Sequence, residues 1–335
     1  MTDISIIMPV FNAADTLNQC LRSIQDQTFK NYEVVVIDDG STDDSVGIIQ
    51  QHQQTDSRIK LHQNSKKGLV SSLNDGLQHS NSFIIARMDA DDIMHPQRLE
   101  LQYNYLADSP DTGLIASQVQ LFPEKDIKKG YQEYMHWQNS CLTHTQISSQ
   151  IYIESPFAHP SVMFRKAIIN QTGYYRDGEF PEDYDLWLRM YIAGIKMEKL
   201  ELSLLKWRDS SGRTSRIDTR YSKNAFDQLR AKYLAIDKRI PTDRPLVFWG
   251  AGRKTRLRAQ LLIKQGFPPS AWIDVDPKKI GNIIHSARVH PPEWLHQYNK
   301  PFVLNYVNNY GAREKIEKFM ETCGYRQDED YLMIG

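Results

Sequence analysis

The sequence is short of cysteine, of net charge and of long hydrophobic runs, and each shortage excludes a class of protein. Its three cysteines, Cys20, Cys141 and Cys323, form no C-x-x-C pair, which argues against a disulfide framework and a zinc site. Basic and acidic residues number 41 each, so no overall field attracts nucleic acid. No apolar run could span a bilayer, and the first residues lack signal-peptide features. We therefore expect a cytoplasmic protein without a nucleic-acid partner.

One basic stretch departs from this balance. Between Lys206 and Arg244, eleven basic residues stand against five acidic ones, a local net charge of +6. Such a stretch is usually a solvated face. The alternative is attraction to phosphates, either those of a ligand or those of an anionic membrane surface. The sequence therefore leaves peripheral association with a membrane open.

The first ninety residues alternate between short β-branched runs and stretches with apolar residues at helical spacing. Alternation of this kind predicts right-handed crossovers and a parallel, doubly wound sheet. The middle of the chain, roughly 95–240, is predicted to be mixed and more helical. The expected strands are 5–11, 32–40, 58–63 and 82–89, and the expected helices are 14–28, one from about 44, and 68–79.

A second domain is predicted to begin near residue 240. The polar segment "DKRIPTDRP" carries two prolines and is typical of a linker, and a fresh alternation of strands and helices follows it. A chain of 335 residues also suits two domains. We therefore expect an α/β protein whose larger domain covers 1–240 and whose smaller, Rossmann-like domain covers 241–335.

The smaller domain opens on an incomplete nucleotide-binding motif. Gly250 and Gly252 match the first two glycines of G-x-G-x-x-G, whereas Thr255 stands in the third place. Asp274 and Asp276 follow near the distance typical of a ribose contact. The alternatives are a bound nucleotide and a tight strand-to-helix turn that serves packing or regulation. A dehydrogenase is the weakest interpretation, because no catalytic group accompanies the motif.

Acidic side chains gather where the strands of the larger sheet are predicted to end. In "ARMDADD", Asp89 and Asp91 are two apart, so an extended backbone points both the same way. Paired carboxylates suit Mg²⁺ or Mn²⁺ that also holds phosphate oxygens. The alternative is that these acids cap a helix that begins near Pro96, a role that suits Asp92. Spacing alone favours neither.

The end of the second predicted strand carries another acidic pair. Asp38 and Asp39 open the turn "IDDGSTDDS". Ordinary turn and cap chemistry explains most of its residues. The functional alternative is that one of these two carboxylates accepts hydrogen bonds from a base or a ribose lying across the strand ends.

Several segments in order resemble the family 2 glycosyltransferases of GT-A fold, and the resemblance covers roughly residues 3–220. It implies transfer of a sugar from a nucleotide diphosphate donor, usually a UDP sugar, with inversion at the anomeric carbon. The matching segments are "SIIMPVFNAADTLNQCLRSIQDQTF", "YEVVVIDDGSTDDS", "NSKKGLVSSLNDGL", "IARMDADD", "HPSVMFRK" and "PEDYDLWLR".

The resemblance also assigns site residues. It implies that Pro9 and Phe11 lie beside the uracil and that Asp39 hydrogen-bonds its ring. It implies that Asp89 contacts the ribose and the metal shell, and that Asp91 ligates the metal directly. The nucleotide sugar and a divalent cation, Mn²⁺ or Mg²⁺, are thus the expected ligands.

For the general base the resemblance points to Asp183, the second acid of "PEDYD". Inverting transfer needs one carboxylate that takes the proton of the acceptor hydroxyl. We expect a helix to begin here, and its positive end would favour the ionised form of Asp183. The alternative is the ordinary preference of first helical turns for acids. The sequence does not exclude Asp185, on the same turn, as the base.

Three further residues could have either a functional or a structural role. His159 either lines the site or is structural, and a lone histidine is more often structural. Trp187 is expected to pack, and Arg189 to pair with an acid. The segment "KWRDSSGRTSR" matches a part of the family near the diphosphate, where some relatives carry a histidine ligand, yet no histidine occurs in 206–244. A second protein ligand of the metal is therefore not identified.

The leading hypothesis is an inverting, metal-dependent glycosyltransferase of the hexosyltransferase type. A saccharide or glycolipid acceptor in cell-surface polysaccharide synthesis would fit both the family and the basic stretch. A nucleotidyltransferase would normally carry a glycine-rich, basic signature after the first strand, and "MPVFNAADT" has neither glycine nor lysine. The third hypothesis is a sugar-nucleotide-binding scaffold with a decayed site. The sugar, the acceptor hydroxyl and the oligomeric state are not encoded in any pattern we can interpret.

Overall fold

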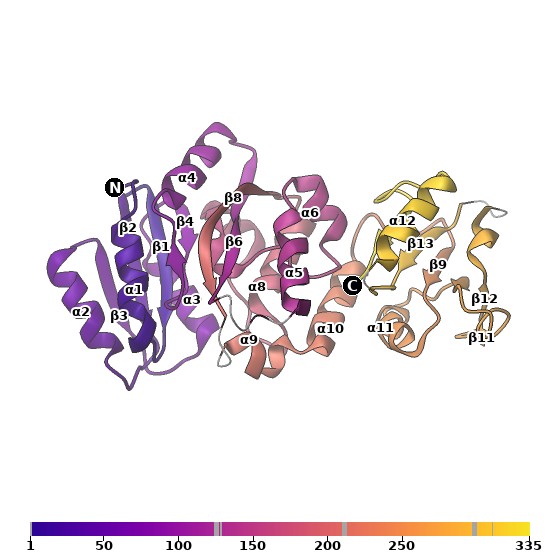
Figure 1. Cartoon of the computed structure of the whole chain (residues 1–335), viewed down its shortest axis with the longest axis horizontal. Coiled ribbons are helices and arrows are strands. Elements are labelled where there is room, and N and C mark those ends of the chain that lie inside the picture. The colour runs from indigo at the N-terminus through magenta and orange to yellow at the C-terminus, as the bar shows by residue number, and fades with distance from the viewer. Residues whose placement is uncertain (1, 124–126, 128, 210–212, 297–299, 310) are drawn as a thin grey trace. The chain divides into compact units, whose positions relative to one another are not determined.

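The chain folds into two compact units, each with its own sheet. The computed structural model describes residues 2–123, 127, 129–209, 213–296, 300–309 and 311–335 (Figure 1). The first unit consists of 1–147 and 155–218, and the second of 148–154 and 219–335. The predicted boundary near residue 240 lies within the second unit. Whether a chain that ends near residue 241 folds alone therefore stays a prediction.

The first unit is built on an eight-stranded, mostly parallel sheet, which confirms the predicted fold class (Figure 1). The spatial order of its strands is β3-β2-β1-β4-β7-β6-β8-β5. The strands are β1 Ile4–Val10, β2 Tyr32–Asp38, β3 Ile59–Gln63, β4 Ile84–Arg87, β5 Ile93–Met94, β6 Thr112–Phe122, β7 Met163–Arg165 and β8 Lys196–Arg208. The helices are α1 Ala14–Gln25, α2 Ser45–Thr55, α3 Leu69–His79, α4 Arg98–Asp108, α5 Lys129–Ser140, α6 His144–Gln150, α7 Ala167–Thr172, α8 Glu182–Ile192 and α9 Thr214–Ile217.

The parallel part of this sheet is buried because helices cover both of its faces. Every residue of β2 is buried, and β1 is buried except at the half-buried Pro9. Strands that are buried on both faces have nearly continuous apolar sequences, so they could be predicted from the sequence. Gly76 of α3 faces Ile7, whose Cγ2 atom would lie 2.4 Å from a Cβ at that position. The absent side chain lets α3 approach the sheet closely.

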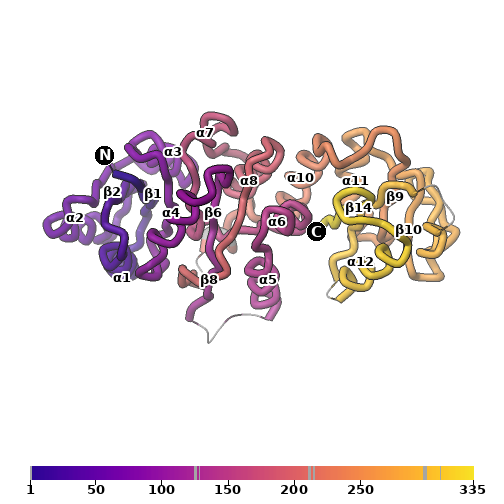
Figure 2. Tube along the Cα trace, turned by 90° about the horizontal axis from the view of Figure 1, so that it is seen from above, coloured from indigo at the N-terminus to yellow at the C-terminus, as the bar shows by residue number. Residues whose placement is uncertain are grey.

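The middle of the chain is mixed and more helical, as predicted, and it also contributes two long strands, β6 and β8, that were not located from the sequence. Strands β6 and β8 run side by side in parallel, with register shifts between Thr112 and Val119 (Figure 2). In β8 the buried residues Met197 and Lys199 alternate with partly exposed ones. A lysine in a sequence normally indicates an exposed position, so Lys199 hides the alternation of buried and exposed residues. Its ammonium is buried and donates to the carbonyls of Gln138 and Pro156.

The second unit has a six-stranded sheet in the order β11-β12-β10-β9-β13-β14, parallel except between β11 and β12. This confirms the predicted second α/β sheet. Its strands are β9 Leu246–Trp249, β10 Ala271–Ile273, β11 Ile283–Ile284, β12 Ala287–His290, β13 Phe302–Asn305 and β14 Tyr331–Met333, and its helices are α10 Lys223–Leu234, α11 Arg253–Ile263 and α12 Ala312–Thr322.

The segment that we predicted to be a linker is packed into this second unit. Asp237 is buried and pairs with Arg239 at 2.8 Å. Arg239 also donates to the carbonyl of Ser148 and to Asp328. Charged residues that suggested a linker, Asp237 and Arg239, thus form ion pairs within the unit.

None of the helices in the described ranges is long and apolar enough to cross a membrane. The expected cytoplasmic location and the peripheral association with a membrane stay predictions.

Candidate active site

The candidate site lies at the carboxyl edge of the parallel strands in the first unit. Strand β1 pairs with β2 on one side, with Val10 opposite Asp38, and with β4 on the other, with Ile7 opposite Arg87. The residues that follow β1, β2 and β4 therefore reach the same edge. Open α/β sheets bind ligands at such an edge.

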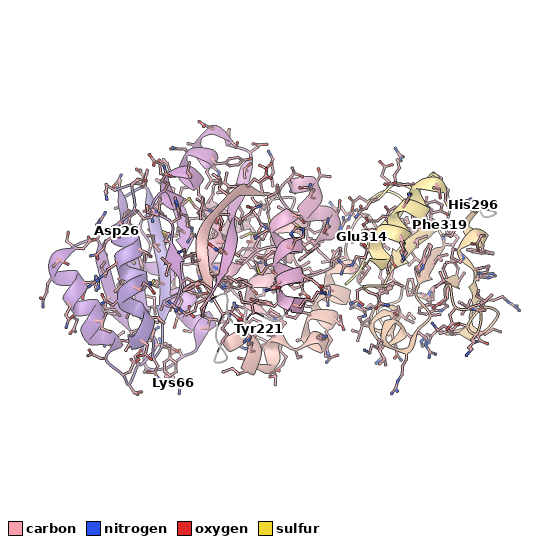
Figure 3. All side chains as sticks on the ribbon, viewed as in Figure 1. Asp26, Lys66, Tyr221, His296, Glu314 and Phe319 are labelled. Atoms are coloured by element: carbon pink, nitrogen blue, oxygen red, sulfur yellow. The ribbon has the colours of Figure 1, made fainter. Side chains whose placement is uncertain are left out.

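Of the residues expected beside a nucleotide base, Pro9 lies near the end of β1, whereas Phe11 and Asp39 directly follow β1 and β2. Phe11 is 45% exposed. The ammonium of Lys66, a residue that Figure 3 labels, lies 5.0 Å from the centre of the Phe11 ring. The Asp39 carboxylate is buried and accepts the backbone N–H groups of Lys67 at 2.7 Å and Gly68 at 2.8 Å. Each oxygen uses one hydrogen bond, so further acceptor capacity remains. The exposed ring and the fixed carboxylate directly follow the paired strands β1 and β2 at the same edge of the sheet.

Asp38 has a different role. Its buried carboxylate accepts the backbone N–H of Ser41 at 3.3 Å, which stabilises the turn after β2. Of the two acids that the sequence left open, Asp38 thus supports the turn.

Three carboxylates converge after β4. Oxygens of Asp89, Asp91 and Asp92 all lie within 4.8 Å of one another. Burial, followed by the charge of Asp89, raises the pKa of Asp91 to about 6, and the same causes raise the pKa of Asp92 well above its usual value. The Oδ2 atom of Asp92 is buried without a hydrogen-bond partner among the described residues. Crowded, under-partnered hard oxygen ligands fit a divalent cation such as Mg²⁺ or Mn²⁺.

The alternative role of Asp92 as a helix cap is wrong. Helix α4 begins at Arg98, and its N-cap residue is Gln97. Asp92 instead accepts the backbone N–H of Arg208 at 2.7 Å. It therefore ties the end of β8 to the acidic segment.

Arginines supply counter-charges to the acid cluster, and these contacts were not predicted from the sequence. Arg87 donates to Asp89 at 2.6 Å, and Arg208 donates from its side chain to the carbonyl of Asp91 at 2.6 Å. Arg213 is close enough for its charge to lower the pKa of Asp91. Arg87 had a local signal, because it is a basic residue that ends a strand of buried residues two positions before Asp89. Arg208 and Arg213 lie in the segment that matches the family near the diphosphate.

The side chain of Arg213 is held by aromatic rings. Its guanidinium lies 4.0 Å from the ring centre of Trp207 and donates to the Tyr131 hydroxyl at 2.6 Å. Part of the basic stretch therefore turns inward, whereas Lys206 is exposed. Residues 210–212 of "KWRDSSGRTSR" lie outside the described residues.

On helix α8 the two candidate acids, Asp183 and Asp185, have different surroundings. Asp185 is 0% exposed and accepts Arg189 Nε at 2.8 Å, which confirms that Arg189 pairs with an acid. Arg189 further donates to the carbonyls of Thr172, Gly173 and Tyr174. Asp185 is thus part of a buried structural pair. Asp183, by contrast, is half-buried.

The pKa of Asp183 shifts in the direction opposite to our expectation. Burial, followed by the charge of Glu182, raises it to about 8. The backbone N–H of Tyr184 donates to its Oδ1 at 2.7 Å and acts in the other direction. Desolvation and the neighbouring acid thus outweigh the helix end. A carboxylate with a raised pKa is a stronger proton acceptor once it is ionised.

A group of buried rings lies beside Glu182, the neighbour of Asp183. His159 Nε2 is 2.8 Å from the Tyr175 hydroxyl, and its Nδ1 is 3.9 Å from Glu182 Oε1. Trp187 is fully buried and meets the His159 ring edge-on at 5.8 Å. Burial, followed by the charge of Arg87, lowers the pKa of His159 well below its usual value. A neutral, packed histidine supports a structural role, and the packing of Trp187 is confirmed.

The glycine motif of the second unit forms a tight, internally satisfied turn. Gly250 has φ +109, and a Cβ there would lie 2.8 Å from Thr255 Cγ2. Asp274 accepts the backbone N–H of Ala251 at 2.8 Å and pairs with Lys279 at 3.2 Å. The turn itself accounts for the glycine and the acid. A ligand of this unit stays a prediction.

Sequence comparison gives matches over the first unit and beyond. A family model described as "Glycosyl transferase family 2" matches residues 5–173. A putative glycosyltransferase, EpsE of Bacillus subtilis, is 32% identical over 253 residues, which cover 73% of this chain and 88% of that protein. An O-antigen biosynthesis glycosyltransferase, WbnJ of Escherichia coli, is 31% identical over 234 residues, which cover 68% and 87% respectively.

Solved structures give matches of the same fold. TarS 1–349 of S. aureus in complex with UDP-GlcNAc has a TM-score of 0.54 and 17% identity, covering 70% of this chain and 72% of that one. The mannosyltransferase PcManGT of Pyrobaculum calidifontis, in complex with GDP-Man and Mn²⁺, has a TM-score of 0.51 and 18% identity, covering 69% and 61%. At these identities the likeness concerns the fold alone.

Proposed function

Since the chain belongs to glycosyl transferase family 2, we propose that it moves a sugar from a UDP sugar to a hydroxyl of a saccharide or glycolipid, with inversion. The observation that carries the proposal is the group of three converging carboxylates at the carboxyl edge of the sheet. The Escherichia coli relative is named for O-antigen biosynthesis, which supports a role in cell-surface polysaccharide synthesis. A membrane-associated acceptor would explain a peripheral location.

Asp89 and Asp91 would hold the divalent cation. Among the described residues, Oδ2 of Asp92 has no hydrogen-bond partner, and the pKa of Asp91 is raised. Both observations indicate that this cluster needs positive charge. When bound, Mn²⁺ or Mg²⁺ would offset the charge that develops on the leaving diphosphate. The Mn²⁺ complex of the Pyrobaculum mannosyltransferase supports this choice of ion.

Pro9, Phe11 and Asp39 would bind the base of the donor. The exposed Phe11 ring offers a stacking face, and the buried Asp39 carboxylate offers a fixed acceptor for a ring N–H. Nucleotide diphosphate sugars occupy two neighbours of the same fold, UDP-GlcNAc in one and GDP-Man in the other. We propose a uracil base, which the resemblance to the family implies, and its imide N–H would donate to the Asp39 carboxylate.

Asp183 would act as the general base. The acceptor oxygen forms a bond to the anomeric carbon while the bond from that carbon to the diphosphate oxygen breaks. The hydroxyl proton passes to Asp183, and the electron pair leaves with the nucleoside diphosphate. Attack from the face opposite the leaving group inverts the anomeric carbon. A pKa of about 8 suits this task, because the base is strong yet partly ionised near neutral pH.

The test is a screen of UDP and GDP sugars with Mn²⁺, read first as thermal stabilisation and then as release of the nucleoside diphosphate. A bound donor raises the apparent stability of the folded protein. We expect one UDP sugar to stabilise the protein and to be turned over, and both effects to disappear in EDTA. Absence of binding and of turnover with every nucleotide sugar would refute the proposed function.

A further inference from the structure

The acid segment, residues 89–92, is held from behind by hydrogen bonds to its backbone carbonyls. The Cys20 thiol donates to the carbonyl of Asp89 at 3.3 Å, and the Thr16 hydroxyl donates to the carbonyl of Ala90 at 3.2 Å. Both donors belong to helix α1 and lie four positions apart, so they share one face of that helix. Helix α1 therefore fixes the first two peptide groups of the segment and uses none of its carboxylate oxygens.

Arg208 holds the second half of the acid segment. The pairing of Ile93 with Lys206 joins β5 to β8 in antiparallel register, so Arg208 comes to lie opposite Asp91. Its Nε atom donates to the carbonyl of Asp91 at 2.6 Å, and its backbone N–H donates to the Asp92 carboxylate at 2.7 Å. One residue at the end of β8 thus contacts two consecutive acids.

The guanidinium of Arg208 is itself fixed by two other elements. Its Nη2 atom donates to Oε1 of Gln19 on α1 at 2.9 Å, and its central carbon lies 4.4 Å from the ring centre of Phe122 at the end of β6. A planar guanidinium can stack on a ring and donate in two directions at once, which an ammonium cannot do. The side chain therefore joins α1, β6 and β8 to the acid segment.

The acceptor that Arg208 uses distinguishes positioning from neutralisation. Its guanidinium donates to the carbonyl of Asp91 and to Gln19 rather than to a carboxylate. A guanidinium that served mainly to neutralise acids would bind carboxylate oxygens, because these match its fork of donors. Binding of the carbonyl instead keeps the side-chain oxygens of Asp91 outside the contact, where a cation can bind them.

We infer that Arg208 is a positioning residue that fixes the backbone of Asp91 so that the Asp91 carboxylate faces the divalent cation. The inference rests on the proposed function, in which Asp91 ligates the metal. A ligand that is held in its binding conformation beforehand need not be ordered at the cost of binding free energy. Loss of the Arg208 side chain should therefore raise the Mn²⁺ concentration that the site requires, while the backbone contact with Asp92 stays.

The experiment measures UDP affinity at a series of Mn²⁺ concentrations in the wild type and in Arg208→Gln. Because a contact that orients a metal ligand is typically worth tenfold or more in metal affinity, the Mn²⁺ concentration for half-maximal UDP affinity should rise about tenfold. At saturating Mn²⁺ the UDP affinity should return to near the wild-type value. A loss that persists at saturating Mn²⁺ would overturn the inference, because Arg208 would then act on the nucleotide rather than on the cation site.

Arg208→Lys separates the position of the side chain from its charge. Removal of a positive charge beside a cation site would by itself favour Mn²⁺. If charge were the only role, Arg208→Gln would lower the Mn²⁺ requirement and Arg208→Lys would leave it unchanged, and this pattern would refute the inference. If position matters, both variants should raise the requirement, since lysine lacks the planar fork.

Gln19→Ala tests the same contact from an exposed position, where a substitution does not disturb the core. Loss of its hydrogen bond to Arg208 should raise the Mn²⁺ requirement about threefold. The effect should vanish in the Arg208→Gln background, because the two residues act through one contact. Additive effects would contradict this coupling. If neither Arg208 variant folds, an unchanged Mn²⁺ requirement in Gln19→Ala alone would overturn the inference.

Arg58→Gln is the matched control. Arg58 is also half-buried, lies 4.1 Å from the ring centre of Tyr32 and donates to the carbonyl of Lys30, but its acidic partner is Asp56. It should leave the Mn²⁺ requirement unchanged. An equal rise in Arg58→Gln would show that the rise in Arg208→Gln reflects a general loss of stability, and the inference would fail.

The outcomes separate the inference from the proposed function. A wild-type protein that binds no UDP, or that binds UDP equally well in Mn²⁺ and in EDTA, would overturn the metal-dependent donor site itself. A wild type with Mn²⁺-dependent UDP binding, together with an unchanged Mn²⁺ requirement in Arg208→Gln, defeats only the role assigned to Arg208.

Discussion

The two units each place aspartates at the carboxyl edge of a parallel sheet, but they leave these acids in different states. In the second unit, Asp274 accepts a backbone N–H and pairs with Lys279, which lies 3.4 Å from Asp276 as well. In the first unit, an oxygen of Asp92 is buried without a partner among the described residues, and the pKa of Asp91 is raised. An acid that the fold satisfies stabilises structure, whereas an acid that the fold leaves short of positive charge is a candidate for ligand binding.

The largest expected effect comes from Asp183→Asn. The amide has nearly the shape of the carboxylate but cannot accept the proton of the acceptor. Transfer should fall by roughly 10²–10⁴-fold, with UDP affinity nearly unchanged. The measurement is turnover at saturating donor, together with a UDP titration.

Asp185→Asn is the matched variant on the same helical turn. Because it leaves the buried Arg189 without its charged partner, it should lower the stability of the fold strongly. Turnover per folded molecule should remain near normal. If Asp185→Asn loses turnover and Asp183→Asn retains it, the assignment of the base is wrong.

The next largest effect is expected from Asp89→Asn. This residue would contact the donor and the metal shell in the ground state and in the transition state, so binding and turnover should both fall. We expect UDP affinity to fall about tenfold or more, since a charged ligand and a charge-assisted hydrogen bond are lost together. A variant with normal UDP affinity would place the donor elsewhere.

A third prediction concerns Glu33, a satisfied acid of the first unit that lies outside the site. Burial alone would raise its pKa, but hydrogen bonds from Lys60, Ser5 and Asn81 outweigh burial and lower it to about 2. Because the folded pKa lies below the unfolded value of about 4.3, the stabilisation is present above pH 4 and is lost as the pH falls towards 2. Glu33→Gln should cost about 2–3 kcal/mol of unfolding free energy at pH 7.

Denaturant unfolding at pH 7, 4 and 3 tests this prediction. The difference between wild type and Glu33→Gln should shrink as the pH falls, and turnover at pH 7 should be unchanged. Asp111→Asn, which removes an exposed acid that pairs with Lys196, is the control and should have no measurable effect. A difference that stays constant with pH would show that the charge of Glu33 is not the cause.

The smallest effect is expected from Asp274→Asn in the second unit. The amide keeps an acceptor for Ala251 but loses the pair with the half-exposed Lys279. We expect a loss of about 1 kcal/mol or less and unchanged UDP affinity. A clear drop in UDP affinity would mean that the acids of the second unit serve the donor as well.

Much of the fold could be predicted from the sequence, since buried parallel strands and the helices between them have distinct apolar patterns. Strand β8 could not, because Lys199 occupies a buried position that only tertiary carbonyl partners satisfy. The polar segment before β9 was misinterpreted for a similar reason, since Arg239 finds its partners in residues far along the chain. Local patterns do not encode such long-range pairs.

The same limit applies to the site. Its acids stand out in the sequence because they cluster, and the resemblance to a family assigned them roles. The inward turn of Arg213 depends on Trp207 and Tyr131, which lie on different elements. The choice between Asp183 and Asp185 required knowledge of which acid meets Arg189. Sequence located the charges, whereas the structure determined which of them are already paired.

The most direct test of this account is a calorimetric titration of UDP into the wild-type protein and into Asp91→Asn, each in Mn²⁺ and in EDTA. The account predicts that the wild type binds UDP much more tightly in Mn²⁺, because the cation supplies the charge that the acid cluster lacks. It predicts that Asp91→Asn largely loses this difference. Equal UDP affinity of the wild type in Mn²⁺ and in EDTA would contradict the central claim that these under-partnered carboxylates form a metal-dependent donor site.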